Sequence, residues 1–155
     1  MRSVRTVTVR RTLPGTVHEL EQRWYDTSRW SAWIDGLGRV VEVAGDWPRV
    51  GSSVTWDSGP AGRGRVVERV VAYETLEGQT LEVEDSSITG RQSVAFVPVE
   101  DGVEVQLSLA YELKQRSLLT PVVDTLFIKR AMSTSLATTL SRFGAEVGSR
   151  RAPLH

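Results

Sequence analysis

Hydrophobic and polar residues alternate most regularly between residues 103 and 114. One set of alternate positions is apolar or aromatic: Val103, Val105, Leu107, Leu109, Tyr111 and Leu113. The intervening positions are mostly polar: Glu104, Gln106, Ser108, Ala110 and Glu112. A period of two with one apolar face is typical of an antiparallel strand that buries one side. The sequence therefore predicts a long strand here, preceded by a turn at Asp101 and Gly102.

The period changes to about 3.6 residues after Pro121, which favours a helix from there to Gly148. Its apolar stripe consists of Val122, Val123, Leu126, Phe127, Leu136, Ala137, Leu140, Phe143 and Val147. The middle of the same face carries Arg130, Ser133 and Thr134. This gap in the stripe either faces a cavity or faces solvent, and periodicity leaves both alternatives open.

The rest of the chain predicts one strand, two helices and five further strands. The first strand is expected over 3–13, the helices over 14–26 and 27–33, and the later strands over 38–45, 52–57, 63–74, 79–85 and 88–98. Consecutive antiparallel strands curl as they twist, and a long helix can lie across the concave face. We therefore predict an α+β fold of order β-α-α-β6-α, with a seven-stranded curved antiparallel sheet wrapped around the C-terminal helix.

Composition and charge exclude several classes of function. Nineteen basic residues balance nineteen acidic ones, so no net charge attracts nucleic acid. The absence of cysteine and the presence of only two histidines, His18 and His155, disfavour thiolate chemistry and metal sites. No apolar run approaches the ~20 residues that cross a bilayer. We expect a cytoplasmic protein without a metal, a cofactor, bound nucleic acid or an integral membrane segment.

Three of the five tryptophans, Trp24, Trp30 and Trp33, lie within ten residues, where a predicted helix ends. Trp24 is expected to pack on the apolar face of its helix, and Trp30 to be partly exposed in a turn. Trp33 either plugs the bottom of the core or forms a wall of a cavity between sheet and helix.

Three motifs in a fixed order carry a resemblance to a known superfamily. An aspartate precedes two tryptophans spaced by three, at Asp26, Trp30 and Trp33. A V-G-[ST] segment occupies residues 50–52, and an F-x-P-x-x-x-G pattern occupies residues 96–102. With these motifs the chain resembles the START/Bet v 1-like (SRPBCC) superfamily, especially its polyketide cyclase/dehydrase and lipid-transport branch.

The resemblance implies a helix-grip fold with an apolar pocket between the sheet and the C-terminal helix. It covers almost the whole chain, so a single domain is expected over 1–148 and a flexible tail over 149–155. Members of the superfamily bind lipids, sterols, quinones or polyketides, and some cyclise or dehydrate polyketides. Because one fold hosts many functions, the resemblance implies no particular reaction.

Tyr111 and Arg69 are the candidate catalytic residues. A buried tyrosine hydroxyl can donate a hydrogen bond to a ligand carbonyl or act as a general acid. The alternative is that the Tyr111 hydroxyl reaches bulk water at the end of the strand and has no role in a site. Arg69 can polarise a carbonyl if it points inward, but its strand carries valines on both faces and an outward arginine is the alternative. The residues expected to line the pocket are Trp33, Trp56, Leu81, Val83, Arg91, Val94, Phe96, Leu107, Leu109, Val123, Phe127 and Arg130.

The leading hypothesis is binding or carriage of a hydrophobic small molecule, such as a lipid, an isoprenoid or a polyketide-like compound. The alternative is a polyketide cyclase, aromatase or dehydratase whose cavity templates the substrate while Tyr111 and Arg69 act as donors. A third hypothesis is a protein-interaction module with an apolar patch around Trp30 and Trp47. The sequence leaves open whether the protein is an enzyme, and whether it is a monomer or a homodimer.

Overall fold

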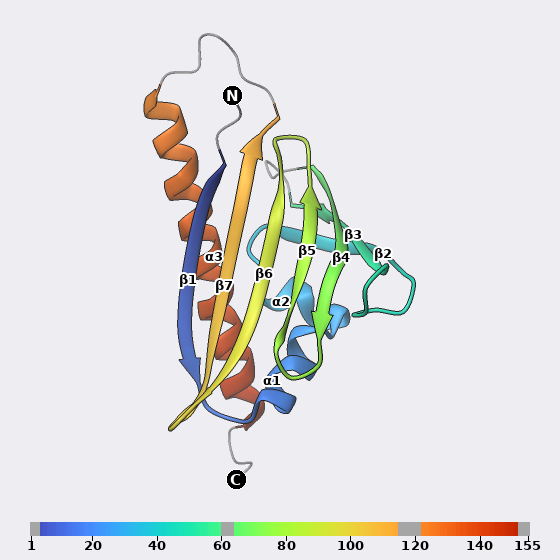
Figure 1. The fold of residues 1–155 in the computed structure, drawn as a ribbon, viewed down its shortest axis with the longest axis vertical. Coiled ribbons are helices and arrows are strands. Elements are labelled where there is room, and N and C mark those ends of the chain that lie inside the picture. The colour runs from blue at the N-terminus through green and yellow to red at the C-terminus, as the bar shows by residue number, and fades with distance from the viewer. Residues whose placement is uncertain (1–3, 60–63, 115–121, 152–155) are drawn as a thin grey trace.

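The computed structural model describes residues 4–59, 64–114 and 122–151. Its strands are β1 (Arg5–Leu13), β2 (Leu37–Ala44), β3 (Ser53–Ser58), β4 (Arg65–Glu74), β5 (Gly78–Glu84), β6 (Ile88–Val99) and β7 (Gly102–Leu113). Its helices are α1 (Val17–Trp24), the 3-10 turn η1 (Thr27–Arg29), α2 (Trp30–Trp33) and α3 (Val122–Arg151). This order confirms the predicted α+β architecture, and each strand begins and ends within two residues of its expected bounds (Figure 1).

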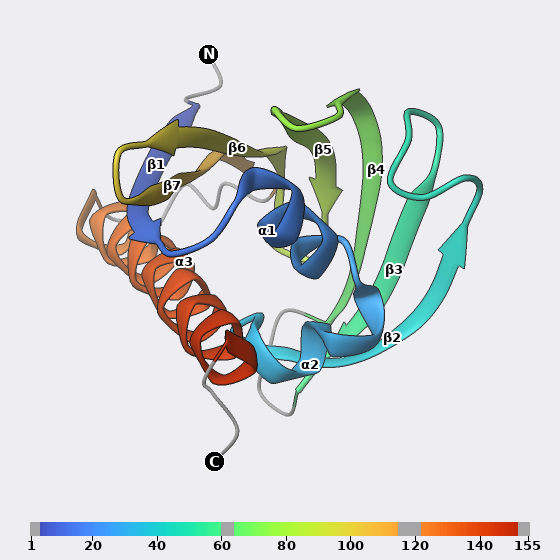
Figure 2. The ribbon, with the colours of Figure 1, turned by 90° about the horizontal axis from the view of Figure 1, so that it is seen from below.

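All seven strands form one antiparallel sheet in the order β1-β7-β6-β5-β4-β3-β2. The sheet curves strongly, with α1 and α2 on its concave side and α3 along the end that carries β1 (Figure 2). The predicted helix-grip arrangement is thereby confirmed. The concave face, α1, α2 and α3 together enclose the interior of the protein.

The alternation in β7 sets which side chains enter that interior. Val103, Val105, Leu107, Leu109 and Tyr111 are all buried. The register places Leu107 beside Val9 of β1 and Val94 of β6. Since paired residues of antiparallel strands point to the same face, one apolar surface runs across three strands. The hydrophobic pattern of the sequence is thus the pattern of the core.

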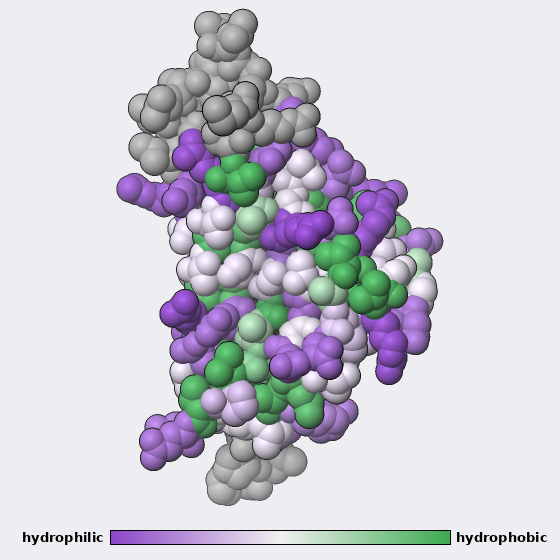
Figure 3. Space-filling view, in the orientation of Figure 1, coloured by the Kyte–Doolittle hydropathy of each residue, from purple (hydrophilic) through white to green (hydrophobic). Residues whose placement is uncertain are grey.

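The outer face of the sheet carries polar and neutral residues with several apolar patches among them (Figure 3). Hydroxyl groups pair across neighbouring strands, Thr8 with Ser108 at 3.0 Å and Thr80 with Ser93 at 3.0 Å. These pairs lie on the face opposite the core, which explains why the strands alternate between apolar and polar residues.

The helix ends differ in detail from the sequence prediction. α1 begins after Thr16, whose side chain accepts a hydrogen bond from the Glu19 backbone in a capping box, and not at Pro14. The cap of the next turn is Asp26, which accepts a hydrogen bond from the Ser28 backbone. At the C-terminus α3 continues to Arg151, so part of the expected 149–155 tail is helical. Pro121, the predicted first residue of this helix, lies outside the described residues.

An aromatic cluster joins the three helices at one end of the interior. The rings of Trp24, Trp33 and Phe143 lie 4.7–4.9 Å apart, centroid to centroid, and come from α1, α2 and α3. Trp30 is buried in the same cluster, packed edge-on against Trp47 at 5.5 Å. The expectation that Trp30 is partly exposed is therefore wrong, and Trp30 and Trp47 do not form the exposed patch of an interaction module.

Candidate functional site

A small cavity of about 40 Å³ lies between the concave face of the sheet and the helices. The strands contribute Trp56, Glu68, Gln79, Leu81, Val83, Gln92 and Leu107. The helices and the loop after α2 contribute Trp24, Trp30, Trp33, Ile34, Asp35, Ser135, Leu136 and Thr139. Four indole rings and five aliphatic side chains thus surround a space that six polar side chains also reach.

The cavity volume of about 40 Å³ limits what the cavity can hold. A water molecule needs roughly 10–15 Å³ by the same measure, so the space accommodates about three waters. Sites for small organic ligands measure roughly 300–1,000 Å³. The cavity is therefore much smaller than the open hollow expected from the gap in the C-terminal helix, and a ligand of useful size requires the surrounding side chains to move.

Trp24, Trp30 and Trp33 line the cavity from the helix side, and Trp56 of β3 lines it from the sheet. Indole hydrogen bonds differ among the tryptophans of this region. The indole Nε1 of Trp30 donates to the Trp24 backbone carbonyl at 2.8 Å. The neighbouring Trp47, outside the cavity lining, likewise donates to the Tyr25 carbonyl at 2.9 Å. The Nε1 of Trp33 has no hydrogen-bond partner among the described residues, although Trp33 is only 1% exposed. A buried donor without a partner costs about 1–3 kcal/mol, so only ring packing holds Trp33 in place.

Polar side chains on the sheet form the opposite wall. Glu68 of β4 is only 5% exposed and points into the interior beside the cavity. Gln79 of β5 is buried and donates through Nε2 to the Pro48 carbonyl at 3.0 Å. Gln92 of β6 completes this wall. The sequence analysis did not select these three residues, and for Glu68 the alternation of β4 gives no signal, because both faces of the strand carry valines.

The loop after α2 is fastened to α3 at the edge of the cavity. The Asp35 backbone donates to Oγ1 of Thr139 at 3.0 Å, and Ser135 donates to the Asp35 carboxylate at 2.8 Å. Arg142 lies 3.4 Å from the same carboxylate. The polar residues of α3 that reach the cavity are therefore Ser135 and Thr139, and not the expected Arg130, which is exposed.

The predicted pocket residues divide into four groups in the structure. Those that line the cavity are Trp33, Trp56, Leu81, Val83 and Leu107. Those that are buried in the core without lining it are Val94, Phe96 and Leu109. Those that are exposed are Arg91 on the outer face of β6 and Arg130 on α3. The side chains of Val123 and Phe127 lie outside the described residues.

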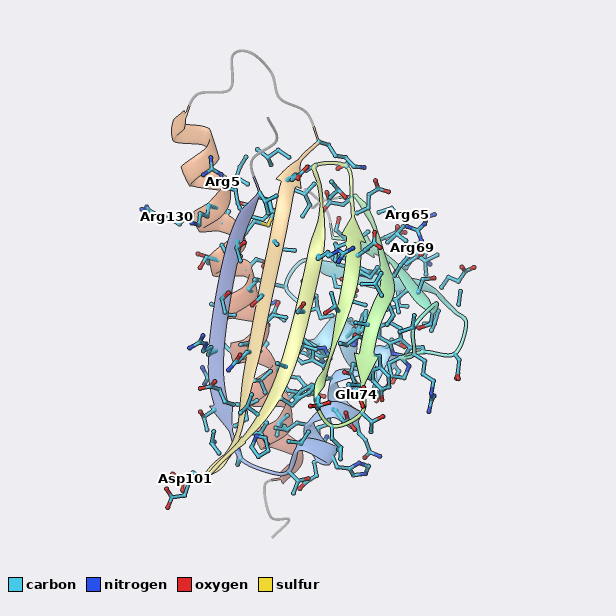
Figure 4. The ribbon with its side chains drawn as sticks, viewed as in Figure 1. Arg5, Arg65, Arg69, Glu74, Asp101 and Arg130 are labelled. Atoms are coloured by element: carbon cyan, nitrogen blue, oxygen red, sulfur yellow. The ribbon has the colours of Figure 1, made fainter. Side chains whose placement is uncertain are left out.

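Tyr111 and Arg69, the predicted catalytic pair, lie on opposite faces of the sheet. Tyr111 is buried on the concave side, and its hydroxyl has no hydrogen-bond partner among the described residues. Burial raises the pKa of Tyr111, and the nearby Arg5 guanidinium partly opposes this effect. Arg69 is exposed on the outer side, next to Arg65 (Figure 4). The two side chains do not meet in one cavity, so the expected donor pair is wrong.

Tyr25 makes the stability of this region dependent on pH. Burial raises the pKa of its hydroxyl well above the usual value, and Tyr73 and Glu21 add to the rise. Tyrosine in an unfolded chain ionises near pH 10, so this contribution to stability is complete below about pH 10. It is lost as the pH rises further, because the unfolded state then releases the proton first.

We therefore expect Tyr25→Phe to reduce the loss of stability at alkaline pH. Urea denaturation across roughly pH 8 to 11 should give a shallower fall in the free energy of unfolding than wild type. At neutral pH the variant should be as stable as wild type or slightly more so, since it removes a buried hydroxyl without a partner in the described residues. Parallel curves for the two proteins would contradict this account.

Within the described ranges, no three His, Asp or Glu side chains gather closely enough to hold a metal ion. No helix in that part of the chain is long and apolar enough to span a membrane. The site therefore consists of aromatic, aliphatic and polar side chains.

Comparison with solved structures identifies similar folds. TTHA0849 from Thermus thermophilus has a TM-score of 0.79 at 16% identity, covering 96% of this chain and 100% of that one. The di-domain ARO/CYC protein StfQ of the steffimycin biosynthetic pathway has a TM-score of 0.75 at 16% identity, covering 95% of this chain. This chain spans only 51% of StfQ. Norcoclaurine synthase from Thalictrum flavum, solved with dopamine and hydroxybenzaldehyde, has a TM-score of 0.70 at 11% identity, with coverage of 98% and 91%.

Sequence comparison places the chain in a family. No curated protein sequence matches it. The family described as polyketide cyclase / dehydrase and lipid transport matches over residues 4–148, which is nearly the whole chain and every described strand. This protein, with its curved sheet closed by three helices, belongs to the polyketide cyclase/dehydrase and lipid transport family.

Proposed function

We propose that the protein binds a hydrophobic small molecule with aromatic character in the cavity between the sheet and the helices. One observation carries the proposal: four indole rings line the same cavity as buried Glu68 and Gln79 and half-buried Gln92. Aromatic walls favour a flat ring system, and the polar groups favour a ligand with hydroxyl or carbonyl oxygens. A plain acyl chain would leave those buried polar groups without a partner from the ligand.

Two of the similar structures are compatible with an oxygenated aromatic ligand. The norcoclaurine synthase structure holds dopamine and hydroxybenzaldehyde, both oxygenated aromatic molecules, in a protein of the same fold. StfQ is described as part of a biosynthetic pathway and as an ARO/CYC protein. Because the identities are 11% and 16%, these structures support the fold of the binding site, while the ligand class depends on the side chains of this chain.

Ligand binding must enlarge the cavity, which suggests a direct test. We expect 2-naphthol to bind more tightly than palmitate or farnesol in native mass spectrometry and tryptophan fluorescence titrations. Leu81→Trp should fill the cavity from β5 and weaken 2-naphthol binding by about tenfold or more, equivalent to ~1.4 kcal/mol. Glu82→Trp adds the same ring on the outer face of the same strand and should bind normally. Equal binding by the two variants, or no binding of 2-naphthol by wild type, would reject the proposal.

Buried Glu68 favours a second function, that of a cyclase or dehydratase. A carboxylate in the cavity can remove a proton from a carbon between two carbonyl groups, where protons are already acidic. The amides of Gln79 and Gln92 can then donate hydrogen bonds to the enolate oxygens. In this proposal Gln79 and Gln92 take the donor role that the sequence analysis gave to Tyr111 and Arg69, and Glu68 is the base.

The remaining expectations accompany the proposal. The partner is a hydrophobic small molecule, and the balanced charge supports the expectation that no nucleic acid is bound. We propose that the protein acts in the cytoplasm, as a monomer or a homodimer, and that it needs no cofactor.

A further inference from the structure

A second hollow, the outer groove, lies on the surface beside the aromatic cluster. It measures about 260 Å³ and is bordered by α1, η1 and the C-terminal half of α3. Its rim includes Glu19, Asp26, Arg29 and Glu146. The outer groove is therefore polar, and it is more open to solvent than the cavity.

Trp33 borders both hollows. It lines the outer groove on one side and the interior cavity on the other. The ring is almost fully buried, so its indole fills the space between the two. Trp33 is the one residue that lines both of these hollows, so its ring lies where a passage between them would run.

The ring of Trp33 lacks the indole hydrogen bond that Trp30 and Trp47 make. Trp30 and Trp47 each donate a hydrogen bond from Nε1 to a backbone carbonyl, whereas Nε1 of Trp33 has no hydrogen-bond partner among the described residues. Packing against Trp24 and Phe143 is what keeps the ring in place. If the ring turned toward the groove, Nε1 would gain water or the acidic rim as an acceptor, which offsets part of the lost packing.

The backbone on both sides of Trp33 is fixed to α3. Before it, the Arg29 guanidinium pairs with the Glu146 carboxylate at 2.7 Å. After it, Asp35 is held by Thr139 and Ser135 at 3.0 and 2.8 Å. These two attachments hold α2 in position, so the movable part between them is the side chain.

We propose that Trp33 is the gate of an access route, and that a ligand passes from the outer groove into the cavity when the indole turns aside. The inference rests on the proposed function, since the gate controls access to the proposed binding cavity. It adds the path by which that cavity is reached and the residue that controls the rate.

Access can be measured without any ligand, because the chain contains no cysteine. Leu81→Cys places one thiol in the cavity, and iodoacetamide reports how often that thiol meets solvent. We expect Trp33→Ala to raise the alkylation rate of this thiol by about tenfold or more, because the cavity then opens locally. Trp33→Phe, a smaller change that preserves the aromatic packing, should give an intermediate increase.

Two controls separate the gate from general destabilisation. Val105→Cys places a thiol that is equally buried on the concave face but does not line the cavity, and its rate should not change with Trp33. Trp47→Phe removes a neighbouring indole that lines neither hollow, and it should leave the rate at position 81 unchanged. If both thiols accelerate equally, or if neither Trp33 variant accelerates the thiol at position 81, the gate is refuted.

The proposed function and the gate fail in different ways. Absence of 2-naphthol binding by wild type would reject the binding proposal, while the alkylation rates would still decide the gate. Where 2-naphthol binds, stopped-flow fluorescence of Trp33→Phe should show a raised association rate, because association is the step that the gate limits. An unchanged association rate in that variant would reject the gate.

Discussion

Replacing Phe143 with alanine is expected to lower the free energy of unfolding by about 3–5 kcal/mol. The ring is fully buried and lies 4.8 Å from Trp33 of α2 and 4.9 Å from Trp24 of α1, centroid to centroid. It is the contact through which α3 packs on both other helices in the aromatic cluster. Truncation removes these contacts and leaves a cavity that the surrounding large rings cannot collapse to fill.

Urea denaturation followed by circular dichroism measures this effect. Phe143→Leu keeps most of the apolar volume and should lose clearly less stability than Phe143→Ala. Val99→Ala, at an exposed position of β6, serves as the surface control and should change stability by about 0.5 kcal/mol or less. A loss below about 1 kcal/mol in Phe143→Ala would contradict the central position of this ring.

The fold was predictable because its signals are local and repeated. The period of two in residues 103–113 recurs in the burial of β7, and the change to a period near 3.6 marks α3. Helix starts were less predictable, because a capping box at Thr16 and Glu19 competes with Pro14 as a start signal. The hydrophobic periods along the chain therefore predicted the order of strands and helices better than they predicted the residues at which the helices begin.

The orientation of β4 was the point at which sequence reasoning failed. Val67 and Val71 lie on one face with Arg69, and Val66 and Val70 lie on the other with Glu68, so hydrophobicity does not distinguish the faces. Pairing decides between them: Glu68 lies beside Val54 of β3 and Val83 of β5, whose side chains are buried. A register shift between Val70 and Ala72 further disturbs the alternation. Such tertiary pairing is not visible in a single strand.

The same limit applies to the tryptophans. Sequence spacing placed Trp24, Trp30 and Trp33 near one another, and all three line the cavity. What distinguishes them is the partner of each indole nitrogen, a backbone carbonyl for Trp30 and none in the described chain for Trp33. These partners arise from the turn through residues 25–29, so composition and periodicity do not predict them.

Glu68→Gln is expected to have the largest effect on any reaction in the cavity. If the carboxylate acts as a general base, its loss should lower the rate by roughly 10²–10⁴-fold. The glutamine has nearly the same shape and no basic oxygen pair, so a folded variant separates chemistry from packing. The assay follows deuterium exchange by nuclear magnetic resonance at the carbon between the two carbonyls of benzoylacetone.

Two charge-removing variants outside the cavity make the result specific to Glu68. Glu82→Gln changes an exposed carboxylate on neighbouring β5, and Arg69→Gln changes the exposed guanidinium next to Glu68 in the sequence. Both should retain the wild-type exchange rate, since both side chains are exposed and neither lines the cavity. If Arg69→Gln lowers the exchange rate and Glu68→Gln does not, the catalytic group lies on the outer face of the sheet and not in the cavity. No acceleration of exchange by wild type would leave the cavity as a binding site, in which Glu68 serves to select an oxygen-bearing ligand.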